Sequence, residues 1–416
     1  MKAYLALLAF PLALAAPPMH AGESMPFPQH TVYTAGTIKP AAKTQGELDQ
    51  AVTSFYRVWK AKYLRSTGEG QRYVFCNAEK TFDPQNTRSV SEGHGYGMLA
   101  AVLMAGADPG AQADFDGLYR FFRAHPAENN PDLMAWRQVS KGDSKALVED
   151  ANGRDSATDG DLDIACALLM ADRQWGSRGA VHYRKEAQKV IAAICASESD
   201  PRRHTLTLGN WVDDESRHWG GVRSSDFMPA HLKGFAAASG DPRWTQITDA
   251  SYQILGELSA AFSPKTGLIP DFVAWKQGVY RPAPPGFLEG RNDGCYSYNA
   301  CRVPWRLGTD YLLSGDPRAL ALLAPLNAWV QKATGGAPGK INAGYRLDGK
   351  SLKKDDSAAF TGPLAVAAMT APAQQAWLNA LWADLLARDP AQEDYFGNTV
   401  KLLTMIVISG NWWQPF

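Results

Sequence analysis

The segment ATDGDLDIACALLMADRQW, residues 157–175, joins three aspartates to a long apolar run. Asp159, Asp161 and Asp163 stand near its start, and the following residues are apolar around almost the whole circumference of a helix. A helix of this kind is buried on every side. Two concentric layers of helices provide that environment, because the outer layer covers the inner one. The segment therefore predicts an all-α, double-layered helical toroid.

The aspartates themselves have two interpretations. Acidic side chains favour the first turn of a helix because they cap free N–H groups and face the positive end of the helix dipole. Capping explains one or two of them, whereas three acids at the head of an apolar helix indicate a polar cavity. Asp159 and Asp163 are four residues apart and share one face of the helix. This segment alone leaves both interpretations open.

Asp-Pro dipeptides recur between apolar helical segments. They occur in GADPG (106–110), SDPRR (199–203), GDPRW (240–244), GDPRA (315–319) and RDPAQ (388–392). We interpret each as a helix start, with Asp as the cap and Pro at the first helical position. Their irregular intervals argue against a solenoid of fixed period. Strand signals are sparse, and no linker follows residue 30, so we predict one domain over residues 22–416.

The first residues, MKAYLALLAFPLALAAPPMHAG, have the outline of a secretory signal peptide. Their apolar run is too short to span a bilayer, and Pro11 interrupts it. We expect removal of residues 1–21 and a secreted or periplasmic monomer without a membrane span. The 42 basic and 42 acidic residues leave no basic excess, which argues against a nucleic-acid partner.

Five cysteines do not indicate a disulfide framework in a chain of this length. Pairing of Cys295 with Cys301 in an oxidising compartment is left open. His94 has no second histidine at ligand spacing, so we expect neither a metal nor a cofactor.

A second acidic helix start lies in SVSEGHGYGMLAAVLMAG, residues 89–106. Glu92 precedes an apolar run, and Gly93, Gly95 and Gly97 permit close approach of another backbone. Two acidic helix starts that open into one cavity suit a hydrolase with two carboxyl groups. One group donates a proton to the leaving oxygen, and the other activates water.

Three segments carry a resemblance to the family 8 glycoside hydrolases. Residues 157–175 resemble the family signature, SEGHGYGM (91–98) resembles the segment with the general acid, and YSYNACRVPWRLGTDYLLSGD (296–316) resembles the last catalytic helix. The resemblance implies an (α/α)6 barrel, no metal and hydrolysis with inversion. It implies Glu92 as the general acid and Asp159 as the central aspartate that holds the sugar and orients water. Asp163 follows one helix turn later on the same face, so we expect it to contact substrate as well.

The sequence departs from the family pattern at Asn299, where many members carry an aspartate base. An amide cannot accept the proton. A subgroup with asparagine here takes a glutamate from the preceding loop, and RPAPPGFLEGRND (281–293) offers Glu289. Its prolines and glycines indicate a loop. We assign Glu289 as the general base, with Asp293 as the competing candidate.

Aromatic and basic residues near these acids are candidates for substrate contacts. Trp136, Trp211, Tyr296 and Tyr298 flank the acidic segments, although core packing is the more common use of such side chains. Arg302 and Arg306 follow Asn299 at helical spacing and can anchor the acids. We expect Asn299 and Arg302 to face the substrate.

The expected substrate is a β-1,4-linked polysaccharide cleaved within the chain. Glucosamine units are cationic, so acidic loops favour chitosan slightly over β-1,4-glucan and mixed-linkage glucan. Besides the three aspartates of residues 157–175, these loop acids are Glu149, Asp150, Asp155, Asp213, Asp214 and Glu215. One alternative is an inactive carbohydrate-binding or envelope protein with the same fold, which we would expect to have lost Glu92. Another is a toroid lyase, which would need a basic groove for its uronic acid substrate.

Overall fold

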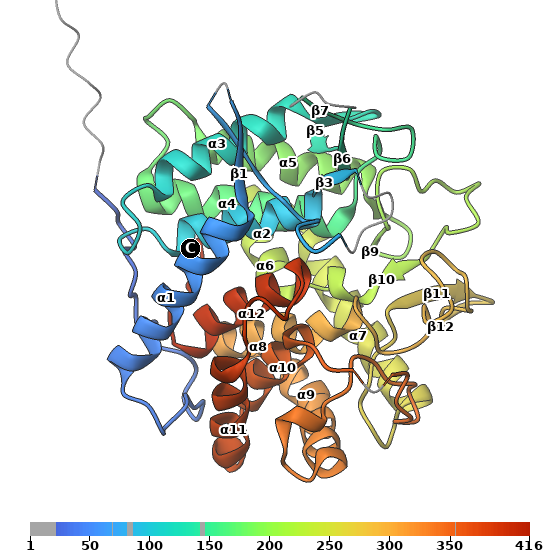
Figure 1. Ribbon diagram of the computed structural model, residues 1–416. Coiled ribbons are helices and arrows are strands. Elements are labelled where there is room, and N and C mark those ends of the chain that lie inside the picture. Colours follow the sequence, from blue (N-terminus) through green and yellow to red (C-terminus); the bar gives the residue numbers. More distant parts are fainter. Residues whose placement is uncertain (1–21, 69, 81–85, 142–145, 354) are drawn as a thin grey trace, which may run out of the picture.

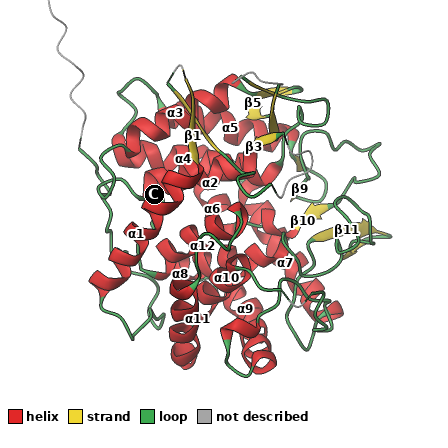
Figure 2. Cartoon of the chain, in the orientation of Figure 1, coloured by secondary structure: helices red, strands yellow, loops and turns green. Residues whose placement is uncertain are grey.

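The computed structural model describes residues 22–68, 70–80, 86–141, 146–353 and 355–416. The signal peptide predicted for residues 1–21 lies outside these ranges. Within them the chain is mainly helical (Figures 1 and 2). The α-helices are α1 (Gln45–Tyr63), α2 (Ser91–Leu103), α3 (Ala111–Ala124), α4 (Thr158–Trp175), α5 (Tyr183–Ser197), α6 (Pro229–Ser239), α7 (Arg243–Phe262), α8 (Val303–Ser314), α9 (Pro317–Thr334), α10 (Ala358–Ala368), α11 (Gln375–Ala387) and α12 (Tyr395–Ile408).

The even-numbered helices form a closed inner ring. Each contacts the next in the order α2, α4, α6, α8, α10 and α12, and α12 returns to α2. The odd-numbered helices form the outer layer: α3, α5, α7, α9 and α11 each pack on the inner helix that precedes them, and α1 packs on α12. This arrangement confirms the predicted all-α fold, an (α/α)6 barrel.

Burial follows the two layers. Every residue of α10 is buried, and α4 is buried along nearly its full length. The outer helix α1 instead buries one stripe, which includes Leu48, Val52 and Phe55. The all-round apolar pattern of residues 157–175 therefore belongs to the inner layer, and one-sided patterns belong to the outer layer.

All five Asp-Pro aspartates accept a hydrogen bond from the backbone N–H two residues further on. The donors are Gly110, Arg202, Arg243, Arg318 and Ala391, at 2.9–3.1 Å. Only Asp316 is the N-cap residue of a helix that begins with the proline, namely α9. Asp108 and Asp241 stand just before α3 and α7, but the N-cap residues of these helices are Gly110 and Pro242. Asp200 and Asp389 organise turns, so the full interpretation, with Asp as the cap and Pro as the first helical residue, is correct for Asp316 alone among the five.

Short strands lie in the connections between helices, where sequence signals were weak. They are β1 (Leu64–Gly68), β2 (Gln71–Val74), β3 (Thr87–Val90), β4 (Pro126–Ala127), β5 (Asn130–Met134), β6 (Arg137–Ser140), β7 (Leu147–Val148), β8 (Ser199–Asp200), β9 (Thr205–Leu206), β10 (Val222–Arg223), β11 (Phe272–Lys276) and β12 (Val279–Pro282). They pair antiparallel as β1-β2, β3-β6-β7, β4-β5, β8-β9 and β10-β11-β12. β3 leads directly into α2.

The structure also bears on membrane-spanning helices and on cysteine pairing. None of the helices in the described ranges combines the length and apolarity needed to cross a bilayer. All five cysteines are free, so the pairing left open for Cys295 and Cys301 is not formed.

Glycines bring the first turns of α2 and α4 into contact. A Cβ atom on Gly95 would lie 2.7 Å from Cβ of Asp163, and one on Gly160 would lie 2.5 Å from Oγ of Ser91. Real Cβ atoms do not approach neighbours this closely, so these positions require glycine. The close crossing places Glu92 and Asp159, one residue from Ser91 and Gly160, at the same end of the ring.

We expect Gly160→Ala to lower the free energy of unfolding by about 1–3 kcal/mol, because the new methyl group overpacks the α2–α4 crossing. Chemical denaturation measures the change. The matched control is Gly256→Ala in outer helix α7, where a Cβ has open space. That change should be neutral or stabilising, by up to about 1 kcal/mol. Equal effects at the two positions would show that the crossing is not tightly packed.

Candidate active site

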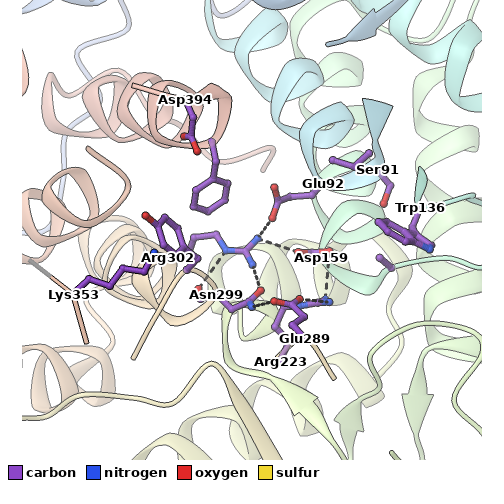
Figure 3. A pocket seen from close by; sticks show the side chains of 14 residues that line it. Ser91, Glu92, Trp136, Asp159, Arg223, Glu289, Asn299, Arg302, Lys353 and Asp394 are labelled. Carbon is purple, nitrogen blue, oxygen red and sulfur yellow. Dashed lines mark hydrogen bonds and ion pairs between the residues drawn. The ribbon is translucent and has the colours of Figure 1, made fainter. Parts of the chain in front are cut away.

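A cavity of about 580 Å³ opens at the amino-terminal ends of the inner helices. Glu92 lies in the first turn of α2, Asp159 in that of α4, and Asp394 is the N-cap of α12. The 3₁₀ helix η2 (Ala300–Arg302) precedes α8 and brings Arg302 to the same place (Figure 3). The lining residues are Val90, Ser91, Glu92, Trp136, Ala157, Asp159, Arg223, Glu289, Tyr298, Asn299, Arg302, Lys353, Asp394 and Phe396.

Arg302 is the centre of the polar network in this cavity. Its side chain is only 1 % exposed. Nη1 donates to Oε2 of Glu92 at 2.5 Å and to Oδ2 of Asp159 at 3.0 Å. Nη2 donates to Oδ1 of Asn299 at 2.7 Å. One guanidinium thus joins the first turns of α2 and α4 to the segment before α8.

Burial raises the pKa of Glu92 to about 7, and the negative charge of Asp159 adds to this effect. Arg302 acts in the opposite direction but does not outweigh the two. The side chain is 20 % exposed, so it reaches the cavity while most of its surface is covered. Glu92 can therefore hold a proton near neutral pH.

The pKa of Asp159 is shifted in the opposite direction from that of Glu92. Burial by itself would raise its pKa, but Arg223 and Arg302 outweigh burial and hold the pKa below its usual range. Nη1 of Arg223 lies 3.5 Å from Oδ1 of Asp159, and the backbone N–H of Gly160 donates to the same oxygen at 3.0 Å. Two neighbouring carboxyl groups in one cavity thus favour different protonation states.

Glu289 reaches the cavity from the loop that follows β12. Its side chain is 52 % exposed, and Oε2 accepts a hydrogen bond from Nδ2 of Asn299 at 2.8 Å. Nη2 of Arg223 lies 3.9 Å from Oε1. Figure 3 shows Glu92 and Glu289 on different sides of the Arg302 guanidinium. The competing candidate, Asp293, is 3 % exposed and does not line the cavity.

The aromatic candidates divide into two groups. Trp136 and Tyr298 line the cavity, and the Tyr298 ring lies edge-on to Phe360 and Phe396. Tyr296 is 2 % exposed, packs edge-on against Phe360 and does not line the cavity. Trp211 packs edge-on against His218 and is not part of the lining. The structure therefore does not support substrate contacts in this cavity for Tyr296 and Trp211.

Asp163 also requires a correction. Its side chain is fully buried, and its oxygens accept hydrogen bonds from Nη1 and Nη2 of Arg306 at 2.9 and 2.6 Å. Nε2 of His231 lies 2.9 Å from Oδ1. Asp163 is one turn deeper in the barrel than Asp159 and cannot contact a ligand in the cavity. His94 is likewise buried, with Nε2 at 2.9 Å from the carbonyl oxygen of Leu118.

Sequence reasoning missed several lining residues. Asp394 begins an inner helix, as Glu92 and Asp159 do, so the same pattern would have identified it. Phe396 follows it by two residues. Arg223 lies on β10, just before the short 3₁₀ helix η1 (Ser224–Asp226). Neither Arg223 nor Lys353 carries a comparable local signal, because neither stands at the start of an apolar inner helix or within a family segment.

The acids that favoured chitosan lie outside the cavity lining. Glu149 lies 2.5 Å from Nδ1 of His125, and Asp150 lies 2.6 Å from Nη2 of Arg137. Asp213 accepts hydrogen bonds from the N–H groups of its own turn. The lining itself combines four acidic residues, Glu92, Asp159, Glu289 and Asp394, with three basic ones, Arg223, Arg302 and Lys353. The charge argument for chitosan therefore does not hold in the folded protein.

Comparison with known proteins gives consistent matches. Residues 25–410 match the model of the Glycosyl hydrolases family 8. A "Beta-glucanase" of Niallia circulans is 45% identical over 413 residues, which is 99% of this chain and 96% of that protein. An "Endoglucanase" of Bacillus sp. (strain KSM-330) is 39% identical and covers 95% of this chain and 83% of that protein. The apo structure of a β-1,3-1,4-glucanase from Paenibacillus sp. X4 is 46% identical, has a TM-score of 0.88 and covers 94% of this chain and 99% of that one.

The raised pKa of Glu92 predicts a specific dependence of stability on pH. Its contribution is fully present below about pH 4.5, the ordinary value, and is lost as pH rises through about 7. Compared with Glu92→Gln, the wild type should lose on the order of 2–3 kcal/mol of unfolding free energy over that interval. Denaturation of both proteins from pH 4 to 8 measures the difference. Parallel profiles would mean that the pKa of Glu92 is not raised.

Proposed function

The chain belongs to family 8 of the glycosyl hydrolases, and from this membership we propose that it is an endo-acting β-glucanase that cleaves β-1,4 linkages with inversion. Mixed-linkage β-1,3-1,4-glucan is the proposed preferred polymer, because relatives near half identity over nearly the full length are named for β-glucan. The observation that carries the proposal is the entry of Glu92 and Glu289 into one cavity from separate elements.

Glu92 is the proposed general acid. Its pKa, raised to about 7 by burial, keeps it protonated at mildly acidic to neutral pH. The proton can then pass to the oxygen of the leaving sugar as the glycosidic bond breaks. Arg302 fixes the carboxyl group by donating to Oε2, so the other oxygen, Oε1, remains available for the substrate.

Glu289 is the proposed general base, which places the chain in the subgroup with asparagine at the usual base position. Asn299 cannot take a proton, and both ends of its amide are engaged: Oδ1 accepts from Arg302 and Nδ2 donates to Glu289. The asparagine therefore presents an N–H to the base. In an inverting reaction this base deprotonates the water that attacks the anomeric carbon.

Asp159 is proposed to hold the sugar and the attacking water. Arg223 and Arg302 overcome the effect of burial and lower its pKa, which makes it a weak proton acceptor. An ionised carboxylate accepts hydrogen bonds from sugar hydroxyl groups and stabilises positive charge that develops on the sugar ring. This role needs no covalent intermediate.

The lining gives no clear charge preference for glucosamine, because four acidic residues, Glu92, Asp159, Glu289 and Asp394, stand beside the basic residues Arg223, Arg302 and Lys353. The proposed preference for glucan rests on the relatives that are named for it. Trp136, Tyr298 and Phe396 offer apolar ring faces to sugar rings. The complete set of acid, base and aspartate argues against a carbohydrate-binding protein without activity.

We also infer that the protein is exported. The sequence predicts a signal peptide, and a β-glucan polysaccharide is too large to enter the cytoplasm intact.

We expect purified protein to release reducing ends fastest from mixed-linkage glucan and more slowly from carboxymethylcellulose. Chitosan should give no release above background. Glu92→Gln serves as the background and should lower kcat by about 10²–10⁴-fold on glucan, because proton donation is lost. Assay of the three polymers side by side decides the substrate. Faster release from chitosan than from either glucan would refute the proposed specificity.

Stereochemistry tests the mechanism separately. Cleavage of a β-linked glucan should first yield the α-anomer at the new reducing end, because water attacks from the face opposite to the leaving group. Proton NMR of the product within the first minutes measures the ratio of anomers before mutarotation. Initial formation of the β-anomer would indicate a covalent intermediate and would remove Glu289 from the role of base.

A further inference from the structure

The side chain of Glu289, at the exposed tip of its loop, has few contacts that hold it in place. Glu289 is 52 % exposed, and its Oε2 receives one side-chain hydrogen bond, from Asn299. Beneath the tip, Phe287 and Leu288 pack against the small apolar cluster formed by Leu208, Val212, Phe272 and Ala283. Apolar packing is not directional. It covers the loop but does not orient the carboxylate.

Directional contacts come from Asp293. Its Oδ2 accepts the backbone N–H groups of Leu288 at 2.7 Å and Glu289 at 3.2 Å, and its Oδ1 accepts that of Gly290 at 2.8 Å. The residue before the base, the base itself and the residue after it are therefore held by one carboxylate. Asp293 is 3 % exposed, so these bonds are shielded from water.

The main chain of Asp293 fixes this carboxylate in turn. Its carbonyl oxygen accepts the N–H of Phe272 on β11 at 2.8 Å, and its own N–H donates to the carbonyl oxygen of Gly290 at 3.3 Å. Phe272 is fully buried. The orientation of the base is thus connected to a strand of the β10-β11-β12 sheet.

Asn299, the hydrogen-bond partner of Glu289, is also held by a buried aspartate that accepts backbone N–H groups. Oδ1 of Asp271 accepts the N–H groups of Ser297, Asn299 and Ala300 at 2.9, 3.2 and 2.7 Å. Asp271 directly precedes Phe272, and its N–H donates to the carbonyl oxygen of Cys295 at 2.7 Å. Both buried aspartates are thus connected to the first residue of β11, Asp271 through the chain and Asp293 through a hydrogen bond. Together they position Glu289 and Asn299 relative to each other.

We propose that Asp293 is a positioning residue that sets the geometry of Glu289 by binding the three backbone N–H groups around it. This inference rests on the proposed role of Glu289 as base. Asp293 is not itself the base, because backbone N–H donors occupy both its oxygens and its side chain does not line the cavity. An amide at this position can accept on one side only, so Asp293→Asn leaves at least one N–H of the loop without a partner.

The test is a double-mutant cycle on mixed-linkage glucan. Asp293→Asn should lower kcat by about 10–100-fold, because a displaced base misaligns the attacking water. The KM should change by less than about twofold, because Trp136 and Tyr298 lie on other segments. In Glu289→Ala, the space left by the side chain admits azide, which attacks the sugar directly. When Asp293→Asn is combined with Glu289→Ala, the residual rates with water and with azide should change by less than about twofold. Asp293 acts through Glu289, and that side chain is absent in this background.

The matched control is Asp213→Asn, a turn aspartate outside the cavity lining that also accepts backbone N–H groups. It should keep wild-type kcat. The inference is overturned if Asp293→Asn keeps wild-type kcat, or if it slows Glu289→Ala as much as it slows the wild type. A Glu289→Ala variant with wild-type kcat would instead refute the base assignment itself. An inactive Asp293→Asn beside that active variant would make Asp293 the base.

Discussion

The active site depends on one buried cation, the guanidinium of Arg302, whose partners come from three separate segments of the chain. Arg302 is almost without exposure, so its charge is stable only beside carboxylates and other acceptors. Asp159 provides the negative charge, and Glu92, Tyr96 and Asn299 accept further hydrogen bonds. The partners come together only when α2, α4 and the segment before α8 stand side by side. Arg302 lowers the pKa of both acids. Burial outweighs it at Glu92, whereas Arg223 and Arg302 together outweigh burial at Asp159.

Much of this arrangement could be predicted from the sequence. An apolar run around a whole helix circumference required an inner layer, and acids at the start of such runs marked the ends that open into the cavity. The pattern failed for Asp163 because residues four apart share a face but differ in depth by about 6 Å along the axis. In a barrel with a closed interior, that depth separates the cavity floor from the ion pair with Arg306.

Other features depended on contacts that no local pattern records. Arg223 lies on a two-residue strand, and only its tertiary position places it between Asp159, Asp226 and Glu289. The acidic loops were misleading for the same reason. Composition counts Glu149 and Asp150 as free negative charge, whereas the fold places them beside His125 and Arg137. The charge of a loop therefore does not predict the charge of a cavity.

The closure of the inner ring has a consequence for biogenesis. The last contact in the ring joins α12 to α2, and most of the chain lies between these helices. During synthesis, α2 lacks one of its two inner-ring neighbours until α12 has emerged. Glu92 lies on α2 and Asp394 caps α12, so the cavity crosses this seam. A nascent or damaged chain with an open ring can keep most of its helices and still lack a complete active site, which makes catalytic turnover a sensitive reporter of finished folding.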